Sequence, residues 1–173
     1  MPTDRAEQVI LAPVEPASPW VEAVRRRFDP LASVVPPHLT LVFPFESELS
    51  PEDVAAHMAA ALAGVAAFEV TLDGLTGAEE SYLFHTVKRG NDELIELHDR
   101  LYSGPLAAHL DATRPYLPHV TVGRVTPVAA WRAALEELVG SAPRSTMTVR
   151  RVVSYRRWPD GSTRPDNSVH LAG

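Results

Sequence analysis

The stretch Pro37-His38-Leu39-Thr40-Leu41 has a counterpart 81 residues further along the chain, Pro118-His119-Val120-Thr121-Val122. Both stretches read proline, histidine, aliphatic, threonine, aliphatic. Successive side chains of a β-strand point to opposite faces of a sheet. Each stretch therefore predicts a strand that buries its two aliphatic residues and presents its histidine and threonine on the other face, one such strand in each half of the chain.

Two imidazoles and two hydroxyls that meet in one cleft are suited to phosphate chemistry. An unperturbed histidine titrates near pH ~6.5, so one ring can accept a proton while the other donates one. Threonine hydroxyls can donate hydrogen bonds to phosphate oxygens without competing as bases. The motifs therefore predict His38 and His119 as the catalytic acid and base, and Thr40 and Thr121 as phosphate-binding residues. Which histidine takes which role is left open.

The sequence around the motifs predicts the element order β-α-β-α-β-β-α-β-α-β-β. Ser18-Pro19 and Ser50-Pro51 each predict a helix start, because serine caps the first turn and proline is tolerated in it. The apolar alternation over 147–155 predicts one long strand, and 168–171 a last short one. No linker separates the two halves, so we expect a single domain over 1–173 with two lobes.

Composition and length are those of an ordinary globular protein, with 173 residues, 45% hydrophobic and 22% charged. The absence of cysteine excludes disulfides and thiol catalysis. No apolar run approaches the roughly 20 residues that span a membrane, and residues 1–5 lack the basic-then-apolar form of a signal peptide. We therefore expect a cytoplasmic monomer without a membrane partner.

The charge distribution restricts the class of partner. A net charge of −6 argues against a general nucleic-acid binder, so we expect no DNA partner and favour small or end-specific substrates over long RNA. The segment 141–164 nevertheless carries six arginines and one aspartate. This segment is either an anion-facing surface or a solvated strand face, and the sequence leaves both open.

The two motifs, His38-Leu39-Thr40-Leu41 and His119-Val120-Thr121-Val122, followed by Arg124, resemble those of the 2H phosphoesterase superfamily. That group includes 2′-5′ RNA ligase-like proteins and cyclic phosphodiesterases, and the resemblance in element order extends over nearly the whole chain. It implies an α+β, bilobal, pseudo-twofold fold with two antiparallel sheets flanking a central cleft and helices on the outside. It also implies metal-independent hydrolysis or transfer at 2′,3′-cyclic or 2′-5′ phosphodiester bonds of RNA ends or small nucleotides, without a cofactor.

Three further residues are candidates for substrate binding. Arg124 is predicted on the opposite face of the strand from His119 and Thr121, because side chains alternate, but a bulge at Gly123 could turn it inward. Tyr116 and Trp158 could stack on a base. No metal is expected, because the chain has no His-x-x-x-His pair on a helix and no carboxylate near either motif.

Two other functions remain possible from the sequence. The same cleft could bind a nucleotide or an RNA end without turning it over, which would make the chain a non-catalytic binding module. Alternatively, the histidines could be buried and purely structural. A product assay distinguishes the first alternative from an enzyme, and histidine titration distinguishes the second.

Overall fold

The computed structural model describes residues 7–173, so the 1–5 segment considered above lies outside the described residues. Its strands are β1 (Glu7–Pro13), β2 (His38–Phe45), β3 (Phe68–Ala78), β4 (Tyr82–Arg89), β5 (His119–Arg124), β6 (Ser145–Val149), β7 (Arg151–Arg157) and β8 (Thr163–His170). Its helices are α1 (Pro19–Phe28), α2 (Pro51–Ala61), α3 (Asn91–Leu101), the 3₁₀ helix η1 (Gly104–His109) and α4 (Val128–Leu138). Within this part of the chain, no helix has the length and apolar character needed to cross a membrane.

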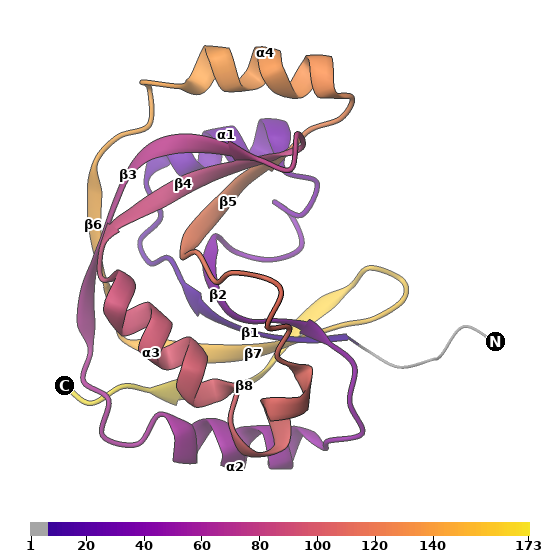
Figure 1. The fold of residues 1–173 in the computed structure, drawn as a ribbon, viewed down its shortest axis with the longest axis vertical. Helices are drawn as coiled ribbons and strands as arrows, with labels where there is room; N and C mark the ends of the chain where they lie inside the picture. The colour runs from indigo at the N-terminus through magenta and orange to yellow at the C-terminus, as the bar shows by residue number, and fades with distance from the viewer. Residues whose placement is uncertain (1–6) are drawn as a thin grey trace.

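The strands form one curled antiparallel sheet in the order β6-β3-β4-β5-β2-β1-β7-β8 (Figure 1). This corrects the expectation of two separate sheets. The motif strands β2 and β5 are neighbours at the centre, and they share a single registered pair, Leu39 with Val120. We call β6, β3, β4 and β5 the β5 half of the sheet, and β2, β1, β7 and β8 the β2 half.

The motif strands bury their aliphatic residues as the alternation predicts. Leu39, Leu41, Val120 and Val122 are fully buried, whereas the histidines and threonines between them are half-buried. Helix α1 packs against β5, and α3 packs against β2. Each motif strand is therefore covered by a helix that the chain places next to the other motif strand.

The helix starts agree with the serine–proline signals. The Ser18 side chain accepts a hydrogen bond from the backbone N–H of Val21 at the start of α1. Ser50 and Asp53 form a reciprocal capping box at the start of α2. These caps satisfy backbone N–H groups that a helix leaves without partners, which explains why both starts are visible in the sequence.

The single strand expected over 147–155 is wrong. The chain breaks at Arg150 into β6, which pairs with β3, and β7, which pairs with β1, so it crosses from one half of the sheet to the other. Met147 and Val149 are buried in β6, and Val152 and Val153 in β7. The buried residues alternate along β6 but are consecutive in β7, and this change in the burial pattern coincides with the crossing. The last strand, expected over 168–171, is the end of the longer β8.

Candidate active site

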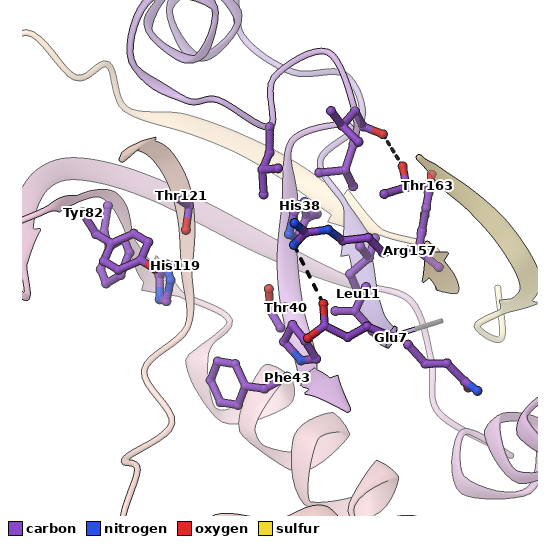
Figure 2. A pocket seen from close by; sticks show the side chains of 18 of the residues that line it. Glu7, Leu11, His38, Thr40, Phe43, Tyr82, His119, Thr121, Arg157 and Thr163 are labelled. Carbon is purple, nitrogen blue, oxygen red and sulfur yellow. Dashed lines mark hydrogen bonds and ion pairs between the residues drawn. The ribbon is translucent and has the colours of Figure 1, made fainter. Parts of the chain in front are cut away.

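One pocket is lined by both motif pairs, with His38 and Thr40 from β2 and His119 and Thr121 from β5 (Figure 2). The four residues predicted from the sequence therefore reach a common space although they lie in opposite halves of the sheet. The pairing of Leu39 with Val120 explains this arrangement. It places the two strands side by side, and the residues that flank this pair on each strand face the pocket.

The two histidines are oriented in the same way. His38 Nδ1 lies 2.8 Å from the carbonyl oxygen of Pro36, and His119 Nδ1 lies 2.6 Å from that of Leu117. A carbonyl oxygen only accepts hydrogen bonds, so each Nδ1 carries the hydrogen and donates it. The Nε2 atom of each ring is then the nitrogen left for proton transfer.

Burial lowers the pKa of both histidines below the ordinary value. The hydrogen bonds to the Pro36 and Leu117 carbonyls oppose this effect, while nearby guanidinium groups add to it: Arg25 lowers the pKa of His38, and Arg114 lowers that of His119. Without a bound anion, both rings are therefore mainly neutral at neutral pH. A phosphate within a few ångströms favours the charged imidazolium, so it can convert one ring to the acid form.

The β5 side of the pocket is lined by aromatic rings and by Glu79, and Phe43 of β2 and Arg114 of the loop before β5 also line the pocket. The ring of Phe84 stacks on His119 with 3.6 Å between centroids, and Tyr82 lies 5.8 Å from Phe84. The guanidinium of Arg114 lies 3.8 Å from the centroid of the Phe43 ring. Among residues 7–173, no carboxylate forms an ion pair with Arg114, although Arg114 is close enough to Asp111 to help lower the pKa of that carboxyl group.

The β2 side of the pocket combines aliphatic residues with polar ones, which include Glu7, Gln8 and Thr163. Thr121 is in register with Phe84 on β4, whereas Thr40 is in register with Leu11 on β1. Val9 of β1 also lines this side. The cation here is Arg157, which lies 3.8 Å from the carboxylate of Glu7.

Reasoning from the sequence missed Arg114, Phe84, Tyr82 and Phe43. Tyr82 and Phe84 could have been found, since they alternate with the buried residues Leu83 and His85 along β4 and so face the same way as the motif histidines. Arg114 and Phe43 had no comparable signal. Arg114 lies in an irregular loop, and Phe43 follows a register shift between β1 and β2.

The three candidate substrate contacts are not among the residues that line the pocket. Tyr116 stacks on His98 with 3.8 Å between ring centroids, and its hydroxyl donates to the carbonyl oxygen of Thr40 at 2.8 Å. Burial raises the pKa of this hydroxyl, which therefore stays protonated. Its ring face is occupied, so Tyr116 supports β2 rather than presenting a stacking surface.

Arg124 and Trp158 lie outside the pocket for different reasons. A register shift between β4 and β5 produces the bulge expected near Gly123, and it brings Arg124 opposite Tyr82, 5.6 Å from its ring centroid. Arg124 is nevertheless exposed, at the end of the central strand β5. Trp158 lies beside the guanidinium groups of Arg156 and Arg164, each 5.9 Å from its ring.

The basic segment 141–164 is largely neutralised by acids from elsewhere in the chain. Four of its six arginines form ion pairs: Arg144 with Asp73, Arg151 with Glu15, Arg156 with Asp166, and Arg157 with Glu7. The excess charge seen in the sequence is therefore not a continuous anion-binding surface. In the described residues, no group of three or more histidine, aspartate or glutamate side chains is placed to hold a metal ion.

The chain matches known proteins over most of its length. The family model described as the 2′-5′ RNA ligase superfamily matches residues 13–160. A protein of Geobacillus kaustophilus named "Putative phosphoesterase" is 28% identical over 136 residues, which is 75% of each chain. A protein of the same name from Geobacillus thermodenitrificans is 29% identical over 126 residues, which is 71% of each chain.

Solved structures share the fold. Escherichia coli LigT complexed with 3′-AMP superposes with a TM-score of 0.63 at 19% identity, covering 98% of this chain and 99% of LigT. LigT complexed with NADP⁺ gives a TM-score of 0.59 at 22% identity, covering 98% and 99%. The Thermus thermophilus protein TT0787 gives 0.62 at 17% identity, covering 96% and 98%. At these identities, the likeness shows the fold alone.

Proposed function

Because the chain belongs to the 2′-5′ RNA ligase superfamily, we propose that it is a metal-independent phosphoesterase. Its substrates are 2′,3′-cyclic or 2′-5′ phosphodiesters of RNA ends or small nucleotides. His38 and His119 are the catalytic acid and base, and Thr40 and Thr121 bind the phosphate. The observation that carries this proposal is that one pocket gathers both His–Thr pairs, with each histidine presenting the same nitrogen.

For a 2′,3′-cyclic substrate, the proposed reaction is a single displacement at phosphorus. The Nε2 of one neutral histidine takes a proton from water as the water oxygen bonds to phosphorus. The other histidine, as imidazolium, gives its proton to the ribose oxygen as the phosphorus–oxygen bond breaks. The product is a nucleoside monophosphate. The two rings end with exchanged protonation states, which solvent then resets.

Charge that develops on the phosphate needs donors close to its oxygens. The hydroxyls of Thr40 and Thr121 lie on the same faces as the histidines and supply neutral donors. Arg114 adds a positive charge that lines the pocket and is not held in an ion pair by any described carboxylate. The negative charge of the bound phosphate in turn supports the imidazolium that the reaction needs.

The class of substrate follows from the size and chemistry of the pocket. Aromatic rings on the β5 side can stack on a base, and such contacts contribute about 1–3 kcal/mol per base. LigT, which shares the fold, forms complexes with 3′-AMP and with NADP⁺. These ligands support small nucleotides as the substrate class for this chain.

The test is a panel of 2′,3′-cyclic mononucleotides and 2′-5′ dinucleotides incubated with the protein in EDTA, with products identified by mass spectrometry. We expect monophosphates or mononucleotides from at least one member. Loss of activity in EDTA would contradict metal independence. Tight binding by calorimetry without any product would instead identify a non-catalytic binding module.

A further inference from the structure

We propose that the β2 side of the pocket is a subsite for an uncharged apolar group esterified to the substrate phosphate. This inference rests on the proposed function, because it takes the phosphate to lie between His38 and His119. A ligand that fills this subsite is an asymmetric phosphodiester, with a nucleoside on one side of the phosphate and an alkyl or similarly apolar group on the other, and it is a further ligand class beside the 2′,3′-cyclic and 2′-5′ substrates proposed above. The group binds to a surface that we call the aliphatic wall, formed by Val9, Leu11, Leu31 and Val34. Tyr155 adjoins it, and the polar residues Glu7, Gln8, Arg157 and Thr163 line the same side of the pocket.

The aliphatic wall is supported by a small hydrophobic cluster beneath it. Leu11, Val35 and Val153 form a small core cluster separate from the main core, and Val9 and Tyr155 pack against it. Leu11 is in register with Thr40, so the wall begins directly beside a proposed phosphate ligand. Leu11 itself is fully buried, so a group attached to the phosphate would contact the partly exposed members of the wall that surround it, Val9, Val34 and Leu31.

The loop that completes the wall is held in place from two directions. Arg25 is 2% exposed, and its Nη2 donates to the carbonyl oxygen of Val35 at 2.9 Å. The hydroxyl of Thr163 donates to the carbonyl oxygen of Val34. These backbone anchors fix Leu31 and Val34 where they line the pocket, although Leu31 remains 38% exposed. A preorganised apolar surface open to solvent gains free energy when a ligand covers it.

The charges on this side argue against a second phosphate. Arg157 and Glu7, which both line this side of the pocket, form an ion pair, as Figure 2 shows, so the Glu7 carboxylate would repel a phosphate that approached Arg157. On the β5 side, by contrast, Arg114 has no such partner among the described residues. The wall thus suits a neutral group, and the opposite side suits the more polar part of the substrate.

The experiment compares adenosine 3′-phosphate with its methyl, n-butyl and n-hexyl esters. Dissociation constants are measured by calorimetry, and turnover is followed by mass spectrometry. We expect the dissociation constant to fall about threefold per added methylene between methyl and butyl, somewhat less than full burial of each methylene would give. Leu31→Ser and Val34→Ser should each weaken this dependence on chain length, because each removes apolar surface from the wall. Both variants should fold, because these side chains are partly exposed and the loop is held by hydrogen bonds to its backbone carbonyls.

Leu110→Ser is the matched control, because Leu110 is 47% exposed and does not line the pocket. It should keep the wild-type dependence on chain length. A dissociation constant independent of chain length, a steep dependence that persists in both wall variants, or no binding of any ester would overturn the subsite. Hydrolysis of cyclic phosphates would be unaffected by that result. A retained chain-length dependence, with no product from the esters or from the cyclic phosphates, would instead remove the proposed reaction and leave the subsite.

Discussion

The two halves of the pocket contain the same reactive groups and different surroundings. In each half, a histidine donates Nδ1–H to the carbonyl two residues earlier, and a threonine follows on the same face. The neighbours across the sheet differ, however: Thr121 is paired with Phe84 on β4, whereas Thr40 is paired with Leu11 on β1. The proposed proton-transfer groups are therefore matched across the site, and the surfaces that would bind the two ends of a substrate are not.

The halves also differ in what holds the motif. Behind His38, the guanidinium of Arg25 pairs with Asp29 at 2.8 Å and is buried with it. Before His119, Tyr116 stacks on His98 and donates a hydrogen bond to the other motif strand. One motif is thus held by a buried charge pair and the other by an aromatic stack, which predicts different sensitivities to substitution.

The largest expected effect is the loss of either histidine. His38→Ala and His119→Ala should each lower turnover by about 10²–10⁴-fold, because each removes one proton-transfer step. The two should differ on a nucleotide with a p-nitrophenyl leaving group, which needs little protonation, so the variant lacking the acid should lose less. Kinetics on both substrates, with circular dichroism as the control for folding, make the assignment. Near wild-type turnover in either variant would exclude that residue from catalysis.

The next effect concerns the buried pair behind His38. Arg25→Met should lower the free energy of unfolding by about 3–5 kcal/mol, because it leaves the Asp29 carboxylate buried without its partner. The double variant Arg25→Met/Asp29→Asn should recover part of the loss. Urea denaturation of both variants provides the measurement. A double variant no more stable than the single one would show that Arg25 acts through its carbonyl contacts instead.

A smaller effect separates the two pocket cations. Arg114→Gln should raise KM for a nucleotide substrate about 10–100-fold, as expected when a charge-assisted hydrogen bond to phosphate is lost. Arg157→Gln should change KM by about threefold or less, because Glu7 already pairs with that charge. Steady-state kinetics at two salt concentrations test both. Equal effects would mean that the Arg157–Glu7 pair opens when substrate binds.

The smallest effect is on pH dependence. Burial lowers the pKa of His38, His85, His98 and His119, so the unfolded chain takes up protons before the folded protein does. The stability contributed by these neutral rings is present above pH ~6.5 and is lost as pH falls through their lowered values. We expect the unfolding free energy to drop by about 1 kcal/mol or more between pH 7 and pH 5, measured by denaturation at each pH. A constant stability would contradict the lowered values.

The same shifts predict the pH dependence of catalysis. The reaction needs one neutral and one protonated ring, so the optimum of kcat/KM should lie below pH ~6.5, and that of kcat should lie higher because bound phosphate favours imidazolium. The limbs of the profile belong to the coupled pair of histidines.

Local signals in the sequence predicted the parts of the fold that depend on local physics. Alternation identified the two motif strands, and Ser18 and Ser50 identified two helix starts because capping involves residues only three positions apart. The break at Arg150 was missed because each side of it reads as a strand, and the choice of partner strand is not local. The pairing of β2 with β5 was unpredictable for the same reason.

The site shows the same division. His38, Thr40, His119 and Thr121 were identified by a repeated pattern, and the structure brings them to one pocket. Arg114 was missed because nothing in a loop sequence indicates which way it points. The charge of the 141–164 segment left two interpretations open, because its ion-pair partners include acids as distant as Asp73 and Glu15.

The exchange of helices between the halves makes the molecule indivisible. A fragment spanning 68–149 would contain every strand of the β5 half, yet it would lack α1, which covers β5; the remaining pieces would lack α3, which covers β2. Neither fragment could bury the aliphatic face of its own motif strand. Each motif strand is thus packed against a helix that comes from the other segment of the chain, in addition to the one registered pair that joins β2 to β5.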